Sequence, residues 1–172
     1  MTPAPPLSPT EIFALPSMPW HPFVVHFPIA LLLLAVAIDV VALLARRHAW
    51  HDTAWRLLVG GTLAALLAVL TGDATAAGHR DAAAAGLIQQ HEDLATICLL
   101  LFVVSCFGRL PVALGREEAR RYVPYWVTLS LVGAGLLVYT GHLGGELVFQ
   151  HGVGVEVNFV PSLDTGRHPD PQ

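Results

Sequence analysis

Four long apolar segments constrain what this chain can fold into. They lie at about residues 23–45, 55–72, 94–107 and 123–141, and the third helix is expected to begin earlier, at about residue 88. Eighteen residues of α-helix rise about 27 Å, which is close to the hydrocarbon thickness of a bilayer. Backbone groups in lipid must form hydrogen bonds inside the protein, which favours helices over open strands. The segments therefore predict an all-α fold, an integral membrane four-helix bundle.

Composition also indicates lipid as the solvent. Of the 172 residues, 54% are hydrophobic and only 13% are charged, and lysine is absent. A soluble domain usually has about a quarter of its residues charged. The formal net charge of −4 leaves no basic surface for nucleic acid. We expect the chain to lie in the lipid bilayer of a bacterial inner (cytoplasmic) membrane, with no nucleic-acid partner.

The arginines predict the orientation of the bundle. Seven of the nine lie in or beside the loops between the first and second segments and between the third and fourth, at positions 46, 47, 56, 109, 116, 120 and 121. The positive-inside rule makes those loops cytoplasmic. Both chain termini and the loop around residues 73–93 are then expected on the outer, periplasmic side.

The remaining segments surround a predicted transmembrane domain at residues 21–160. Residues 1–20 are a proline-rich arm, and residues 161–172 are a polar tail. A glycine-rich outer segment follows the fourth helix at residues 141–157. Its glycines could admit a neighbouring helix or the edge of a cofactor. The alternation of Val153, Val155 and Val157 predicts a short extended stretch over the outer face.

Histidine is distributed in the opposite way to arginine. Six of the nine belong to the predicted outer half, at positions 21, 26, 79, 91, 142 and 151. His48 and His51 lie among the cytoplasmic arginines and are expected to be solvated, and His168 lies in the tail. Interfacial or capping roles remain possible for each outer histidine. Polar residues at membrane depth nevertheless tend to face the bundle interior and to mark function.

Three of these histidines have small residues on the same helix face. His26 shares its face with Ala30, His91 with Ala95 and Cys98, and His142 with Gly135. Such faces would leave room for a flat macrocycle, and imidazole is a good axial ligand for haem iron. We predict His26, His91 and His142 as iron ligands, with His21 and His151 as further cofactor-binding residues. Asp73 and Glu146 are expected to accept hydrogen bonds from the ligands.

Divalent-metal binding is the competing interpretation of the histidines. Three or four of them with a carboxylate would suit zinc, and histidine-rich sites also suit copper. No His-Glu-x-x-His sequence occurs, which gives a zinc hydrolase little support.

Two other features have simpler explanations. Asp39 is an acid inside the first apolar segment, and we expect it to pair with an arginine of the inner loops. Cys98 and Cys106 are eight positions apart, about 12 Å of helical rise, which is too far for a disulfide. We expect both cysteines to be buried small apolar residues.

Several stretches resemble the DUF2231 family of predicted membrane proteins. They are HPFVVHFPIAL at residues 21–31, TGD at residues 71–73, His91, and TGHLGGELVFQHGVGV at residues 140–155. The family usually has an aromatic residue where this chain has Ala74, and we do not include His79 among the ligands. The resemblance implies a four-helix membrane module, with relatives joined to or near c-type cytochrome domains. That association implies redox work and favours haem b over zinc.

The functional prediction is therefore a membrane protein that binds one or two b-type haems in the outer leaflet and transfers electrons. Its expected exchange partners are a quinol (quinone) or a periplasmic c-type cytochrome. Two alternatives remain: a non-catalytic accessory subunit of a larger membrane redox or photosynthetic complex, and a zinc- or copper-binding membrane protein. No pattern in the sequence decides whether the chain catalyses a reaction.

Overall fold

The fold is all-helical over the part of the chain that the structure describes. The computed structural model describes the backbone of residues 20–76 and 84–153, and the side chains of residues 21–72 and 84–153. Its elements in order are α2 (Trp20–Val24), α3 (His26–Leu44), α4 (His48–Ala76), α5 (Ala85–Ala113), the 3-10 helix η1 (Glu117–Tyr122) and α6 (Val123–His151). The predicted arm and tail, together with His79, Val155, Val157 and His168, lie outside the described residues.

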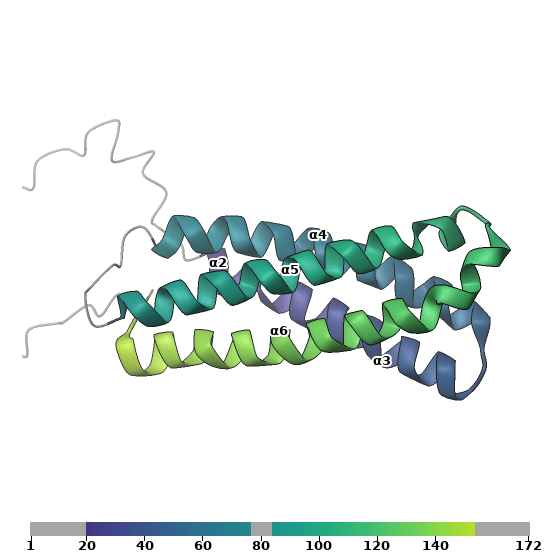
Figure 1. Cartoon of the computed structure of the whole chain (residues 1–172). Coiled ribbons are helices and arrows are strands. Elements are labelled where there is room, and N and C mark those ends of the chain that lie inside the picture. The colour runs from purple at the N-terminus through teal and green to yellow at the C-terminus, as the bar shows by residue number, and fades with distance from the viewer. Residues whose placement is uncertain (1–19, 77–83, 154–172) are drawn as a thin grey trace, which may run out of the picture.

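Four long antiparallel helices form the bundle, as Figure 1 shows. Neighbouring helices pack in a ring: α3 contacts α4 and α6, and α5 contacts α4 and α6. Four helical stretches are long and apolar enough to cross a membrane: His21–Leu44, His48–Gly72, Ala85–Ala113 and Glu117–His151. This confirms the four membrane-spanning helices of the sequence prediction.

The two ends of the bundle carry different side chains. The histidine end is where α2 begins, α4 ends, α5 begins and α6 ends (Figure 1). The arginine end is the opposite one, with the α3–α4 connection and η1. Its side chains include Arg46 and Arg47 after α3 and Arg120 and Arg121 in η1. The antiparallel arrangement thus keeps the two sets of residues apart, as the sequence predicted.

A narrow core holds the four helices together. It contains mostly small or medium side chains around Phe102, which is fully buried; its buried members are Leu32, Ala35, Val36, Leu58, Cys98, Phe102 and Ala134. Glycine allows close approach at two places. A Cβ on Gly133 would lie 3.1 Å from the Phe102 ring, and a Cβ on Gly108 would lie only 2.4 Å from the Trp126 indole. Cys98 belongs to this core as predicted, whereas Cys106 is half-buried.

The helices are longer than the apolar segments that predicted them. Each of α4, α5 and α6 has 29 residues, or about 43 Å of rise, which matches a bilayer with its headgroup regions. Hydropathy marks only the part of a helix that lies in hydrocarbon. The helices continue through polar and glycine-rich turns at the interface.

The prediction that the fourth helix ends at Gly141 is wrong. α6 continues through the glycine-rich sequence to His151, so residues 141–151 are helix and not an irregular segment. It ends at Gly152, whose left-handed φ of 63° lets Val153 N donate to Leu147 O at 3.1 Å. Glycine ends this helix only where its backbone turns left-handed.

Proline divides the first apolar segment into two helices. Pro28 has no N–H to donate to Val24 O, the carbonyl four residues earlier, and α2 ends at Val24. The chain passes through Val25 into α3. Both α2, which carries His21, and α3 pack against α4.

Candidate functional site

A cavity of about 400 Å³ opens among the helices at the histidine end. We call it the histidine cavity. His21, His26 and His91 line it, from α2, α3 and α5 respectively. Most of its other lining is small or apolar; the small residues are Ala65, Ala68, Ala95, Gly141, Gly144 and Gly145. An apolar cavity with a few convergent polar groups is typical of a small-molecule or cofactor site.

Two of these histidines are oriented in the same way by neighbouring helices. Nδ1 of His21 lies 2.9 Å from Ala68 O of α4, and Nδ1 of His91 lies 3.1 Å from Thr140 O of α6. A carbonyl oxygen can only accept, so each Nδ1 carries a proton and donates it. On His91 this leaves Nε2 as the ring nitrogen that does not face Thr140 O. Metal-ligating histidines have this arrangement, with the other ring nitrogen bonded to a carbonyl or carboxylate.

The same two rings lie close together. Their centroids are 6.4 Å apart, and their planes are nearly perpendicular at 89°. With a metal–nitrogen bond of about 2 Å and roughly 1.2 Å from nitrogen to ring centre, two imidazoles on opposite sides of one metal have centres roughly 6.4 Å apart. The observed spacing of His21 and His91 equals this value, and it also lies in the range of about 4.5–7 Å for an ordinary edge-to-face contact between two rings.

Glycines make room for both imidazoles. A Cβ on Gly72 would lie 3.0 Å from Cε1 of His21, and a Cβ on Gly144 would lie 3.2 Å from Cε1 of His91. Gly141 and Gly145 have a different role, because a Cβ on either would meet no atom within 4 Å. Both line the histidine cavity, so their lack of a side chain keeps its volume open.

The other predicted site residues are dispersed. His26 lines the cavity but is exposed, and His142 and His151 are exposed on α6 without lining it. Glu146 is half-buried and does not line the cavity either. The Asp73 side chain lies outside the described residues. Over residues 21–72 and 84–153, no three histidine, cysteine or acidic side chains come together as metal ligands would.

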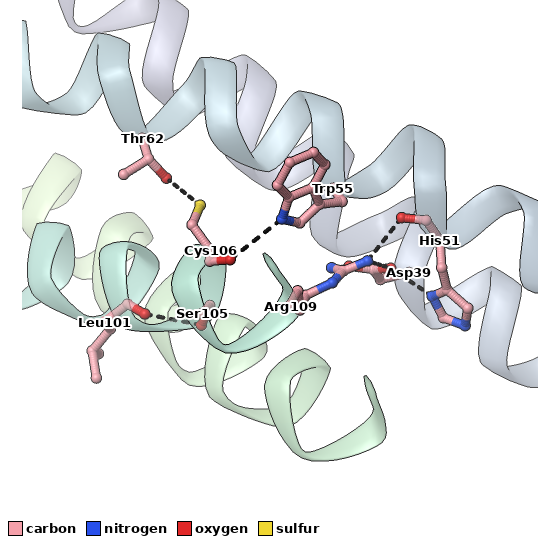
Figure 2. Close-up of polar contacts among 8 residues, drawn as sticks. All are labelled: Asp39, His51, Trp55, Thr62, Leu101, Ser105, Cys106 and Arg109. Carbon is pink, nitrogen blue, oxygen red and sulfur yellow. Dashed lines mark hydrogen bonds and ion pairs between the residues drawn. The ribbon is translucent and has the colours of Figure 1, made fainter. Parts of the chain in front are cut away.

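A second polar cluster lies at the arginine end (Figure 2). Asp39 is fully buried and accepts hydrogen bonds from His51 and Arg109. His51 Nδ1 lies 2.7 Å from Asp39 Oδ1, and one guanidinium nitrogen of Arg109 contacts both Asp39 Oδ1 at 3.1 Å and His51 O at 2.8 Å. The cluster joins α3, α4 and α5. The predicted pairing of Asp39 with an arginine is confirmed, although Arg109 lies within α5 and not in a loop.

The expectation that His51 is solvated is wrong, because its side chain is buried. That expectation started the second helix at residue 55, whereas α4 begins at His48. An earlier start places His51 on one stripe with Trp55, Leu58 and Thr62, at the i, i+4, i+7 spacing of an inward face. His48, one turn before, is exposed as expected.

Comparison with known proteins agrees with the architecture. The family described as "Predicted membrane protein (DUF2231)" matches residues 17–157. No curated protein and no solved structure matches the chain. The family match covers most of the chain, and the four apolar helices account for its description as a membrane protein. This multi-pass membrane protein belongs to the DUF2231 family.

Proposed function

We propose that this protein binds haem b in the histidine cavity, where His21 and His91 would hold it, and transfers electrons at the outer membrane face. The observation that carries the proposal is the bis-imidazole spacing of these two rings, 6.4 Å between centroids. Their Nδ1 atoms are already bonded to the carbonyls of Ala68 and Thr140. The ligands are thus held in place by two helices to which they do not belong, and binding requires little reorganisation.

The donor set fits haem better than zinc or copper. A tetrahedral zinc site needs three or four protein ligands, and the described residues bring together two oriented imidazoles. A haem takes its other four ligands from the macrocycle and needs only two from the protein. The apolar lining and the missing side chains at Gly141 and Gly145 supply space for its ring edge.

In this proposal the residues of the cavity bind the haem, orient the two imidazoles and keep water out. His21 and His91 would hold the cofactor between α2 and α5, and the carbonyls of Ala68 and Thr140 would keep the two imidazoles in position. When bound, haem supplies a one-electron redox centre. The apolar walls of the cavity would keep water away from the haem, and this affects the reduction potential of the haem iron. His26 lies at the exposed rim, on the path to an electron-exchange partner such as a quinol or an outer-face cytochrome.

The proposed orientation places the histidine end outside. Seven arginines flank the opposite end, and the positive-inside rule makes that end cytoplasmic. Both chain termini are then periplasmic in a bacterial inner membrane.

The first test is the absorption spectrum of the purified protein with matched histidine variants. We expect a Soret band that is lost in both His21→Ala and His91→Ala and kept in His142→Ala, because His142 is exposed outside the cavity. Nearly perpendicular imidazole planes predict a strongly anisotropic low-spin ferric EPR signal.

Size-exclusion profiles of the variants in detergent control for folding. A protein that stays colourless when expressed with ample haem supply contradicts the proposal. So does a Soret band that survives in a well-folded His21→Ala/His91→Ala double variant.

A further inference from the structure

A polar pocket of about 290 Å³ lies at the arginine end, between α4, the end of α5 and η1. We call it the arginine pocket. Its charged and polar lining consists of His51, Asp52, Arg56, Arg109, Glu117 and Arg120. It is separate from the histidine cavity, with which it shares no residue.

Among the charged groups that line this pocket, one guanidinium has no ion-pair partner in the described residues. Three guanidinium groups and two carboxylates line it. Arg120 pairs with Glu117, and Arg109 is committed to Asp39 outside the lining. Among the described residues, no ion pair involves Arg56. Arg56 is exposed, and Asp52, which also lines the pocket, lies one turn before it on α4. Because no ion pair joins the two among the described residues, the Arg56 guanidinium is available to a ligand.

An apolar groove of about 370 Å³ adjoins the arginine pocket. It lies between α4 and α5, with Val59 and Leu63 on one wall and Leu99 and Val103 on the other. Trp55 lines both the groove and the pocket, so the two join at its indole. The groove opens toward the outside of the bundle, because two of its lining residues are well exposed. Leu63 is 60% exposed and Phe107 is 69% exposed. In a membrane-spanning helix pair this surface faces lipid.

We propose that the arginine pocket and this groove together bind one anionic phospholipid, with the phosphate near Arg56 and an acyl chain along α4 and α5. The chemistry of each part matches one part of such a molecule. A free anion would not need the groove, and a neutral lipid would not need the arginines. Basic pockets between transmembrane helices on the cytoplasmic side are suited to anionic headgroups. Trp55 lies at the junction, the depth at which tryptophan is enriched in membrane proteins.

The site has a structural consequence for the buried cluster beneath it. His51 and Arg109 line the pocket and also hold Asp39. A bound phospholipid would cover this ion pair and bridge α4, α5 and η1. We therefore expect the lipid to stabilise the arginine end selectively.

Fluorescence quenching tests the proposal on the full chain in delipidated detergent micelles. Phosphatidylglycerol with brominated acyl chains should quench the tryptophan emission more strongly than brominated phosphatidylcholine, and Trp55→Phe should remove that difference. Arg56→Gln should weaken the apparent phosphatidylglycerol affinity about fivefold, the effect of about one basic residue near an anionic headgroup. Val59→Phe should also weaken it by filling the groove.

Arg47→Gln is the matched control, since Arg47 is exposed at the same end but outside the pocket. Equal quenching by both lipids, or an equal loss of affinity in Arg47→Gln and Arg56→Gln, overturns the proposal in favour of non-specific lipid contact. Inorganic phosphate is tested by thermal unfolding beside phosphatidylglycerol. Equal stabilisation by both overturns it in favour of a simple ion pocket. None of these readouts depends on haem.

Discussion

At the scale of single residues, the buried cluster of Asp39, His51 and Arg109 shows how a charge is tolerated inside the bundle. Asp39 receives donors from two other helices, so its carboxylate is paired although it is fully buried. The sequence predicts the arginine partner, because an acid within an apolar segment needs a nearby cation. It does not predict His51, because hydropathy places this residue in a loop.

Asp39→Asn should destabilise the protein strongly, because Arg109 would keep its buried charge without a carboxylate. Removing one partner of a buried ion pair typically costs about 3–5 kcal/mol. Unfolding in mixed micelles measures this change. The exposed pair of Arg120 and Glu117 is the control, and Glu117→Gln should change the unfolding free energy by less than about 1 kcal/mol. Equal effects of the two substitutions would contradict the assigned role of the cluster.

At the scale of helices, proline and glycine have effects that their local propensities alone do not predict. Pro28 interrupts the hydrogen bonding between α2 and α3, whereas the glycines of α6 leave the helix intact to His151. In lipid, an unpaired backbone group is costly, and the glycines therefore stay helical. For the same reason the sequence predicts helix identity well and helix ends poorly. The ends predicted from hydropathy show where the apolar sequence stops. The helix itself continues to its last backbone hydrogen bond.

Pro28→Ala should straighten the first helix and move α2 away from α4. The substitution supplies an N–H for the Val24 carbonyl, which removes the cause of the break. Spin labels at the exposed positions Phe23 and Leu70 would report a longer distance. Pro22→Ala is the control, because a proline in the first turn of a helix replaces no internal hydrogen bond. An unchanged distance in Pro28→Ala would mean that packing alone fixes the break.

Gly108→Ala and Gly60→Ala form a second matched pair. A Cβ on Gly108 would clash with Trp126, whereas a Cβ on Gly60 would meet no atom within 4 Å. We expect Gly108→Ala to destabilise the protein by about 1–3 kcal/mol through overpacking between α5 and α6. Gly60→Ala should be neutral or stabilising by up to about 1 kcal/mol, from helix propensity. Thermal unfolding in detergent compares the two; the same sign for both would contradict the close approach of these helices.

At the scale of the whole molecule, the bundle has chemically different ends. Among the described residues, His21, His26, His91, His142 and His151 lie at one end and the arginines at the other, which also holds His48 and His51. The sequence predicts the two-ended distribution because topology fixes which helix ends meet. It does not predict that His21 and His91 form the close pair, with His142 exposed, because the rotation of each helix depends on packing.

Impermeant thiol labelling in intact cells tests the orientation. In a Cys98→Ala/Cys106→Ala background, Gln150→Cys at the histidine end should react from outside. Glu118→Cys at the arginine end should react only after permeabilisation. Both positions are exposed, so a difference in labelling reports sidedness and not burial. The reverse pattern would place the histidine cavity on the cytoplasmic side.

The two hydrogen bonds that orient His21 and His91 also determine when in biogenesis the site can form. His21 of α2 is held by a carbonyl of α4, and His91 of α5 by a carbonyl of α6. Helices enter the membrane in chain order during synthesis. His21 can therefore form its hydrogen bond only after α4 has been inserted. His91 can form its hydrogen bond only after α6 has been inserted. Both imidazoles reach these positions only once the fourth span has been inserted, so a cofactor that both of them held would be loaded after insertion.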